Sequence, residues 1–325
     1  MRAVFCTKYG TAEVLKIKEI DRPQPKEGEI LIKVVAASVT TADSMMRKGE
    51  PQFSRLFLGW KRPKNPIVGT GFAGIIKDKG ENVDNFKVGD EVFGETGLTF
   101  SSNAEYVVMS AKGVVLPKPS FLSFKEAAPM CDGALTSFNF LKGLAKIKAG
   151  QTVLINGASG SLGVAAIQIA KSMGAIVTGV CSTKNIALVQ SLGADNVIDY
   201  TKNDFTTGSE TYDVIYDTIG KSSFSKCKKI LVTNGIYMSP VLDLTLIWNM
   251  MSTSIFGKKK AIFQATGMRS SADLNKLLKE LLPSFQQKKI KMVIDKIYPL
   301  KDAIKAHEYV DTGRKRGNVV LLMEG

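Results

Sequence analysis

Histidine and cysteine are scarce in this chain of 325 residues. There is one histidine, His307, and the four cysteines (Cys6, Cys131, Cys181 and Cys227) are scattered, with no pair at metal-ligand spacing. This scarcity argues against a disulfide framework, against zinc chemistry and against a Ser-His-Asp catalytic triad. We therefore expect no metal site and a reducing, cytoplasmic compartment. We also expect His307 to be a surface or partly packed helix residue rather than a catalyst.

Long apolar runs are also missing, because none approaches the roughly 18 residues that a membrane-spanning helix needs. Acidic residues are few: 30 stand against 44 basic ones, which gives a formal net charge of +14. That balance favours an anionic partner, such as a phosphorylated cofactor, nucleic acid or an anionic membrane surface, but a general solubility trait is the simpler interpretation. No basic residues interleaved with aromatics mark an RNA-binding module, so we expect no nucleic-acid partner.

The most informative stretch is 151–175, where a short apolar strand leads into three glycines and then into a helix with apolar residues at helical spacing. Gly157 allows a tight turn, Gly160 lets the backbone approach two phosphates, and Gly163 lets the helix lie close to its strand. The first amides of the helix point at a bound anion. This pattern predicts a dinucleotide site, and its expected cofactor-binding residues are Gly157, Ser159, Gly160, Ser161, Leu162 and Gly163.

The end of the second strand distinguishes NAD from NADP, because an acid there accepts hydrogen bonds from the ribose 2′-hydroxyl. In this chain the corresponding residues are Ser182, Thr183 and Lys184, with no acid among them. Hydroxyl groups and a lysine suit a 2′-phosphate, which a carboxylate would repel. The alternative is that Ser182 and Thr183 only cap the next helix. We favour the phosphate interpretation and predict NADPH as the cofactor.

The order of elements predicts two domains of different style. Residues 1–119 read as short strands and turns, and strands alternating with helices follow, which implies a parallel sheet. The segment 45–65 is irregular and rich in cations and large apolar groups, so it is either a pocket lid or a packed surface loop. A helix over 125–142 is expected to be interrupted by a turn at 131–133. The strands of the sheet are expected at 152–156, 176–181, 196–198, 214–217, 235–238 and 261–266.

Several short motifs recur in an order and spacing that resemble a known family. They include Ala36-Ala37-Ser38-Val39, the run from Val88 to Gly94, the glycine turn 157–163, Leu192-Gly193-Ala194-Asp195 and Gly317-Asn318-Val319-Val320. Together they resemble the medium-chain dehydrogenase/reductase superfamily, in its zinc-independent quinone oxidoreductase branch, over nearly the whole chain.

The resemblance implies an α/β fold with a GroES-like β domain (1–124 and 271–325) and a Rossmann domain (125–270), a doubly wound parallel sheet of strand order 3-2-1-4-5-6. It implies that Ser182, Lys184 and Tyr200 hold the 2′-phosphate, that Thr136 lies beside the nicotinamide, and that Gly317 and Asn318 supply a backbone contact near it. It also implies a homodimer, in which the strand around 261–266 pairs the two sheets.

Departures from the family pattern bear on chemistry. The zinc-dependent members carry a cysteine near Thr41, a Gly-His-Glu where this chain has Gly69-Thr70-Gly71, and a four-cysteine loop that is missing between 94 and 106. Without a Lewis acid, simple alcohol oxidation loses its usual stabilisation of an alkoxide. Within the quinone reductase branch, Thr40 replaces a common asparagine and Met45 replaces a frequent tyrosine.

These observations predict hydride transfer from NADPH to a quinone or an α,β-unsaturated carbonyl compound. Thr40, Asp43 and Thr136 are the candidate catalytic residues, because enone reduction benefits from a hydrogen-bond donor near the developing oxyanion. For Asp43 we favour a helix-capping role over a catalytic one. Two alternatives remain: an NADPH-binding protein that mainly contacts RNA or anionic surfaces, and a divergent alcohol dehydrogenase that binds zinc.

Overall fold

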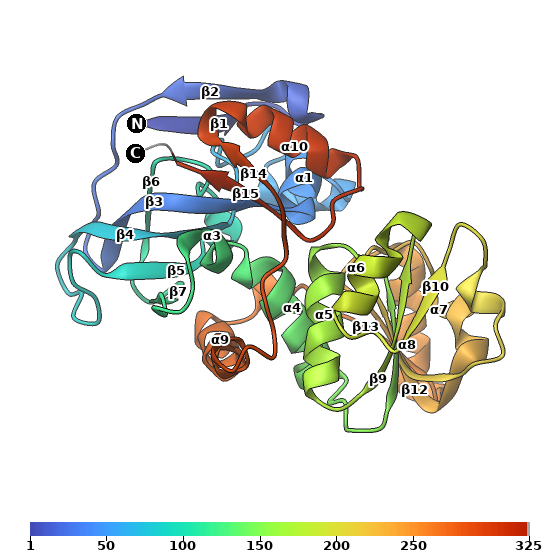
Figure 1. Ribbon diagram of the computed structural model, residues 1–325. Helices are drawn as coiled ribbons and strands as arrows, with labels where there is room; N and C mark the ends of the chain where they lie inside the picture. Colours follow the sequence, from blue (N-terminus) through green and yellow to red (C-terminus); the bar gives the residue numbers. More distant parts are fainter. Residues whose placement is uncertain (324–325) are drawn as a thin grey trace. The chain divides into compact units, whose positions relative to one another are not determined.

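The computed structural model describes residues 1–323, apart from the side chains of residues 57, 255 and 256. The chain divides into two compact units (Figure 1). The first unit comprises Met1–Asp132, Ser270–Leu278 and Ile294–Gly325, and the second comprises Gly133–Arg269 and Lys279–Val293. No helix in the described part of the chain is long and apolar enough to cross a bilayer.

The first unit is built on a seven-stranded sheet whose order is β14-β15-β3-β4-β5-β7, with β6 also paired to β3, and a separate β1-β2 hairpin. All neighbouring pairs are antiparallel except β14 and β15, which run parallel. The strands are β1 (Arg2–Cys6), β2 (Leu15–Glu19), β3 (Glu29–Val39), β4 (Gly71–Lys79), β5 (Glu91–Glu95), β6 (Tyr106–Ser110), β7 (Val114–Pro117), β14 (Ile294–Pro299) and β15 (Asn318–Leu322). The C-terminal strands thus complete the sheet that the N-terminal part begins, as the resemblance implied.

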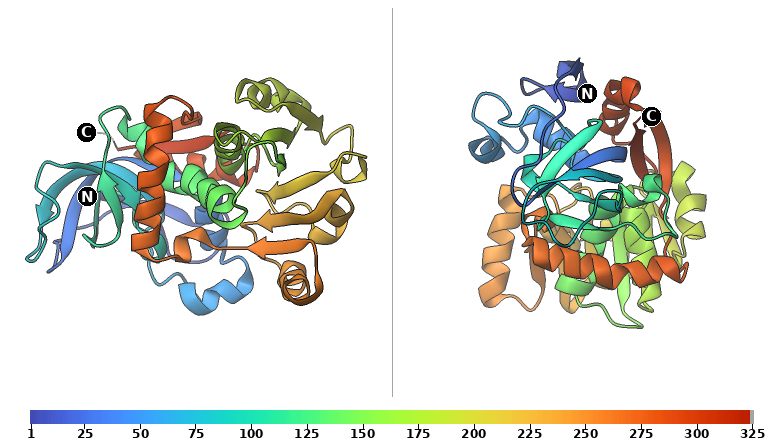
Figure 2. Two further views of the ribbon diagram at one scale, coloured as in Figure 1. Left: turned by 90° about the horizontal axis from the view of Figure 1, so that it is seen from below. Right: turned by 90° about the vertical axis from the view of Figure 1, so that its left-hand side faces the viewer.

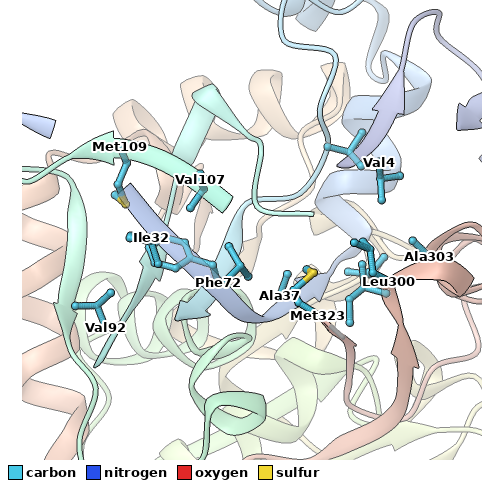
Figure 3. Close-up of a cluster of buried hydrophobic side chains, with 14 of the residues drawn as sticks. Val4, Ile32, Ala37, Phe72, Val92, Val107, Met109, Leu300, Ala303 and Met323 are labelled. Atoms are coloured by element: carbon cyan, nitrogen blue, oxygen red, sulfur yellow. The ribbon is translucent and has the colours of Figure 1, made fainter. Parts of the chain in front are cut away.

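The core of this unit forms where apolar side chains from distant parts of the chain meet (Figure 3). Ile32 on β3 and Phe72 on β4 are fully buried, and Leu300 and Ala303 from the C-terminal segment pack into the same cluster. Burial of apolar surface stabilises a fold by roughly 25 cal/mol per Å². This burial therefore favours the return of the C-terminal segment to this unit. Helix α10 (Ala303–Asp311) carries part of that core.

The second unit contains a six-stranded, all-parallel sheet with the order β10-β9-β8-β11-β12-β13. Numbered along the chain this is the predicted order 3-2-1-4-5-6, which is therefore confirmed. Helices α5 (Ser161–Ser172) and α6 (Ile186–Ser191) cover one face, and α7 (Phe224–Cys227) and α8 (Leu244–Phe256) cover the other (Figure 1). The strands are β8 (Thr152–Asn156), β9 (Ile176–Cys181), β10 (Asn196–Asp199), β11 (Tyr212–Asp217), β12 (Leu231–Ser239) and β13 (Lys260–Phe263).

The prediction of a turn at 131–133 is wrong. The chain there stays helical: α3 (Phe124–Ala127) is followed by a π-helical stretch over Met130–Leu135, by α4 (Thr136–Phe138) and by a second π-helical stretch over Asn139–Leu144. π-helical turns absorb extra residues without ending a helix. Gly133 is buried within the first π-helical stretch, so this glycine does not end the helix.

The segment 45–65, expected to be irregular, is partly helical. Helix α1 (Thr41–Lys48) ends at Gly49, which adopts φ 66° as a left-handed C-cap, and a short helix α2 spans Arg55–Leu58. Glycine is favoured at such a position because it has no Cβ to clash. The expectation for His307 also fails, since its side chain is fully buried. Helix α9 spans Ser271–Gln286.

Candidate functional site

The glycine turn of the second unit joins β8 to α5, and its three glycines differ in their surroundings. Gly157 has φ +79°, a backbone conformation that L side chains rarely adopt. A Cβ on Gly163 would lie 2.2 Å from the carbonyl oxygen of Gly157, so only glycine lets the helix pack this close. A Cβ on Gly160 would meet nothing nearer than 3.5 Å. The space beside Gly160 is therefore open to a ligand.

The N-terminus of α5 and its neighbours complete this turn. Gly160 is the N-cap and Ser161 the first residue of the helix, so the amides that follow lack intrahelical acceptors and face the turn. Ser159 Oγ accepts a hydrogen bond of 2.9 Å from Asn185 Nδ2. Ser137 Oγ donates to the carbonyl oxygen of Leu162 at 2.9 Å. That bond ties the short helix α4, which begins at Thr136, to the glycine turn.

The three residues expected at the 2′-phosphate come together at the ends of β9 and β10. The parallel register pairs Cys181 with Asp199, so the residues that follow each strand, Ser182 and Tyr200, are neighbours. The amide of Tyr200 donates to the carbonyl oxygen of Cys181 at 3.1 Å. Lys184 and Tyr200 are exposed. Exposed cationic and hydroxyl groups at this edge fit a phosphate in water.

Asp199 is a residue of this edge that the sequence reasoning missed. Its carboxylate accepts hydrogen bonds from Thr183 Oγ1 at 2.5 Å and from Thr201 Oγ1 at 2.7 Å. The bond from Thr183 is the main reason that the pKa of Asp199 lies below its usual value. Thr183 is thus engaged by a carboxylate. The position of Asp199 at the end of the third strand of the parallel sheet was the sequence signal that could have identified this residue.

In the first unit, Thr40 and Asp43 form a capping box at the start of α1. The Thr40 amide and hydroxyl donate to Asp43 Oδ2 at 2.8 and 2.9 Å, and the Asp43 amide donates to Thr40 Oγ1 at 3.0 Å. This is the capping role favoured from the sequence. Asp43 is also buried, and burial, with Asp132 nearby adding to the effect, raises its pKa to about 7.

Asp43 belongs to a group of charged residues that sequence reasoning did not bring together. Burial, reinforced by Asp132 and Asp43, raises the pKa of Glu95 to about 7. Burial lowers the pKa of Lys315, while Asp132 and Asp43 act in the opposite direction. Lys315 Nζ lies 3.4 Å from the carbonyl oxygen of Gly317. The predicted residues Gly317 and Asn318 thus lie two and three positions after a buried lysine that interacts electrostatically with Asp132, Asp295 and Asp43.

A cavity of about 100 Å³ lies within the first unit beneath the segment 45–65. Apolar side chains from Met46, Leu58, Ile67 and Phe100 line it, together with the charged residues Asp43, Arg47 and Lys64. The volume lies between that of a single-water site and the roughly 150 Å³ of a cavity that binds benzene.

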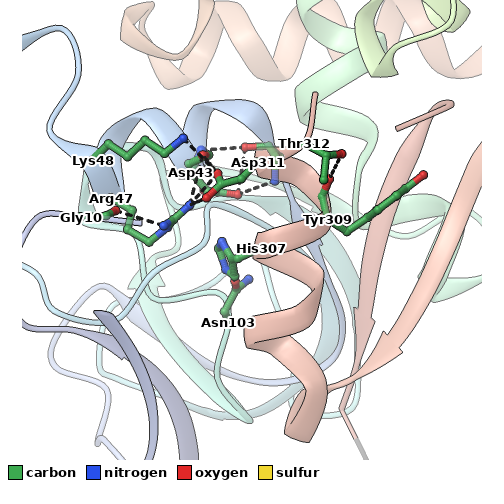
Figure 4. Close-up of polar contacts among 11 residues, drawn as sticks. Gly10, Asp43, Arg47, Lys48, Asn103, His307, Tyr309, Asp311 and Thr312 are labelled. Carbon is green, nitrogen blue, oxygen red and sulfur yellow. Dashed lines mark hydrogen bonds and ion pairs between the residues drawn. The ribbon is translucent and has the colours of Figure 1, made fainter. Parts of the chain in front are cut away.

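His307 and Arg47 have structural roles beside this cavity (Figure 4). His307 Nε2 lies 3.1 Å from Asn103 Oδ1, and burial lowers the pKa of His307 to about 3, with Arg47 acting in the same direction. Arg47 donates to both carboxylate oxygens of Asp311 at 2.7 Å and to the carbonyl oxygen of Gly10 at 3.1 Å. Because His307 is neutral and enclosed, we assign it to packing.

Three threonines, Thr40, Thr41 and Thr70, offer hydroxyl groups at the start of α1 and just before β4. Zinc in proteins is held by thiolate, imidazole or carboxylate groups, and none of these three side chains provides one. Within residues 1–323 no group of three or more His, Cys, Asp or Glu side chains is placed to hold a metal ion.

Sequence comparison defines the class of protein that this fold and these sites represent. Residues 26–120 match the family model of the alcohol dehydrogenase GroES-like domain, and residues 192–321 match that of zinc-binding dehydrogenases. The chain is 33% identical to the 2-methylene-furan-3-one reductase of Solanum lycopersicum, over 99% of this chain and 79% of the relative. It is 30% identical to the quinone oxidoreductase of Homo sapiens, over 99% of this chain and 98% of the relative.

Solved structures agree with this placement. The quinone oxidoreductase from Coxiella burnetii superposes with a TM-score of 0.87 at 28% identity and covers 100% of this chain and 99% of its own. The Escherichia coli quinone oxidoreductase complexed with NADPH, at 24% identity, shares the fold with a TM-score of 0.86 and covers 99% of this chain and 100% of its own. The chain belongs to the medium-chain dehydrogenase/reductase superfamily, in its quinone oxidoreductase branch, and it is an oxidoreductase.

Proposed function

We propose that this protein transfers a hydride from NADPH to a quinone or to the C=C bond of an α,β-unsaturated carbonyl compound. The observation that carries the cofactor assignment is the β9–β10 register, which places Ser182 beside Tyr200 next to the exposed Lys184. The names of the relatives, quinone oxidoreductase and 2-methylene-furan-3-one reductase, support the two acceptor classes. A chloroplastic NADPH-dependent alkenal/one oxidoreductase of Arabidopsis thaliana, 31% identical, supports both the cofactor and the enone class.

The residues of the second unit would bind and orient the cofactor. The amides at the start of α5, with Ser159, Ser161 and Leu162 in the turn, would hold the pyrophosphate at the positive end of the helix dipole. Ser182, Lys184 and Tyr200 would take the 2′-phosphate. The bond from Ser137 to Leu162 fixes α4, so Thr136 would stand beside the nicotinamide.

The residues of the first unit would serve the acceptor. NADPH supplies the hydride when it is bound; the protein aligns the acceptor and excludes water. A quinone that accepts the hydride would need only one proton, which solvent can supply. Enone reduction leaves an enolate, which a hydrogen-bond donor stabilises, and Thr40 and Asp43 are the groups of this unit that we propose for this role. The raised pKa of Asp43, about 7, keeps a proton on that carboxyl in part of the molecules at neutral pH.

We extend the proposal to assembly and location. The protein would act as a homodimer in the cytoplasm, with the two parallel sheets joined through the edge strand β13. Residues 1–124 with 271–325 and residues 125–270 would be its two folding domains. The segment 45–65, whose side chains line the cavity of the first unit, would close over the acceptor.

NADPH oxidation followed by absorbance with a panel of quinones and enones, with NADH alongside, tests this proposal. We expect turnover that favours NADPH, and Lys184→Ala should weaken that preference about tenfold or more, because a charge-assisted bond to phosphate is lost. Lys148→Ala is the matched control, since Lys148 is also exposed but precedes β8 at the opposite end of the strands. NADPH binding without turnover on any acceptor would refute the substrate classes. Failure to bind either nucleotide would refute the whole proposal.

A further inference from the structure

Helix α8 carries a stripe of large apolar side chains that face solvent. Leu244, Trp248 and Met251 are 82%, 70% and 60% exposed, and their spacing of four and three residues places them on one side of the helix. The opposite side packs onto the sheet: Leu246 and Thr253 are buried, and Thr253 Oγ1 accepts a hydrogen bond of 3.1 Å from the amide of Ala261 on β13. Because the buried side chains of α8 face the sheet, the exposed stripe lies on the side of the helix turned away from it. The left view of Figure 2 shows the ribbon of α8 (orange) beside the strands of this sheet.

The surroundings of this stripe are strongly basic. The sequence from Leu244 to Ala272 contains no aspartate or glutamate, and it includes three consecutive lysines at 258–260. Lys260 Nζ binds the carbonyl oxygen of Thr253 at 2.9 Å, which holds this cluster at the C-terminal end of α8. Lys259 Nζ binds the carbonyl oxygen of Lys228 at 2.7 Å, which brings the exposed Lys228 and Lys229 to the same place.

A helix with tryptophan, leucine and methionine on one side and lysines at its end has the composition of an interfacial membrane helix. Tryptophan is favoured at the boundary between headgroups and acyl chains, and lysines beside it are attracted by anionic lipids. We propose that α8, through Leu244, Trp248 and Met251, docks the second unit onto the surface of an anionic bilayer. An anionic bilayer fits this surface because the positive charge of the lysine cluster is opposite to that of the lipid headgroups. The inference does not depend on the proposed reaction.

Docking is compatible with the homodimer proposed above. Antiparallel pairing of two identical edge strands β13 puts the twofold axis perpendicular to the joined sheet, so both copies of α8 lie on the same side of it. Because each stripe faces away from its own sheet, both would face the same bilayer. Two linked contacts bind more tightly than one.

Vesicle binding by the full-length protein tests the proposal. The chain has two tryptophans, so a Trp60→Phe variant leaves Trp248 as the only indole reporter. We expect co-sedimentation with vesicles of phosphatidylcholine containing phosphatidylglycerol, a blue shift of Trp248 emission and quenching by brominated lipids. Binding to vesicles of phosphatidylcholine alone should be at least tenfold weaker, and added salt should weaken binding to the anionic vesicles.

Substitutions on the stripe separate this surface from others. In the Trp60→Phe background, Leu244→Gln with Met251→Gln should lower the partition coefficient at least tenfold, whereas Leu98→Gln, at a leucine of similar exposure in the first unit, should not change it. All of these side chains face solvent, so unchanged melting temperatures should confirm that the variants fold.

Two results would overturn the proposal. The first is no binding to anionic vesicles, or binding that Leu98→Gln weakens as much as the stripe variant does. The second is a blue shift of Trp248 that appears without vesicles as protein concentration rises, together with a mass increase that the stripe variant abolishes. That outcome would assign the stripe to a second copy of this chain.

Discussion

The glycines of the cofactor turn allow the structural and ligand-facing parts of that turn to be separated by two single substitutions. In Gly163→Ala the new Cβ would lie 2.2 Å from the carbonyl oxygen of Gly157 and 2.6 Å from two backbone atoms of Ala158. Backbone atoms cannot move aside as a flexible side chain does, so α5 must shift from its strand. In Gly160→Ala the nearest atom is 3.5 Å away and the backbone has φ −78°, which alanine adopts without strain.

The two variants should change different properties: Gly163→Ala the melting temperature, and Gly160→Ala the affinity for NADPH. Overpacking of this sort costs about 1–3 kcal/mol. At roughly 2–4 °C per kcal/mol for a domain of this size, Gly163→Ala should melt about 2–12 °C below the parent without ligand. Gly160→Ala should melt at or slightly above the parent, because a compatible Gly→Ala change stabilises by about 0.4–1 kcal/mol. Its methyl group occupies the space expected for the pyrophosphate, so the Kd for NADPH should rise about tenfold or more, equivalent to about 1.4 kcal/mol.

Differential scanning calorimetry of the ligand-free variants and calorimetric titration with NADPH give both quantities on the same samples. We expect Gly163→Ala to lose thermal stability and Gly160→Ala to lose affinity for NADPH while keeping the stability of the parent. A Gly160→Ala protein that binds NADPH as the parent does would refute the placement of the pyrophosphate beside Gly160. A Gly163→Ala protein with unchanged stability would refute the packing argument.

Two further predictions concern buried or bonded side chains. The pKa of His307 is about 3 when folded against 6.5 in the unfolded chain, so the unfolded state binds more protons in between and stability falls as pH drops below about 6.5. His307→Gln should remove that loss, which amounts to about 2 kcal/mol between pH 6.5 and 5, measured as urea midpoints at both pH values; an unchanged pH dependence would contradict it. Thr183→Val removes the hydrogen bond that Asp199 accepts at 2.5 Å. Asp199 Oδ2 then loses this donor, while Oδ1 keeps its bonds from Thr201. The less compensated charge repels the 2′-phosphate more strongly, so the Kd for NADPH should rise while that for NADH should not, and an equal effect on both nucleotides would contradict this explanation.

The sequence predicted the second unit closely because its signals are local. The expected strands 152–156 and 176–181 match β8 and β9 residue for residue, since buried parallel strands read as short apolar runs between turns. The acid cluster of the first unit was missed for the opposite reason: Asp43, Glu95 and Asp132 are brought together only by the fold. The burial of His307 escaped as well, because a lone histidine in a helical pattern gives no sign of which side it faces.

The missed acid cluster leads to a prediction about the pH dependence of stability. Burial and the neighbouring acids raise the pKa of Glu95 from 4.5 to about 7. A group with a raised folded pKa contributes stability that is fully present below pH 4.5 and is lost as pH rises through about 7. At about 1.4 kcal/mol per pH unit, the loss approaches about 3 kcal/mol above pH 7. Glutamine keeps the shape of the side chain and carries no charge, so Glu95→Gln should escape this loss.

The measurement is the difference in free energy of unfolding between Glu95→Gln and the parent at pH 5 and at pH 8.5. Trp60 lies in the first unit, so its emission in a Trp248→Phe background follows the unfolding of that unit. We expect the variant to gain about 3 kcal/mol on the parent between the two pH values. Glu81→Gln, at an exposed glutamate of the same unit, should show no such gain. Because His307 acts only below about pH 6.5 and in the opposite direction, it cannot produce a gain at high pH. Equal pH dependence in variant and parent would mean that Glu95 is charged in the folded protein at pH 5, which would refute the effect of burial on this carboxyl.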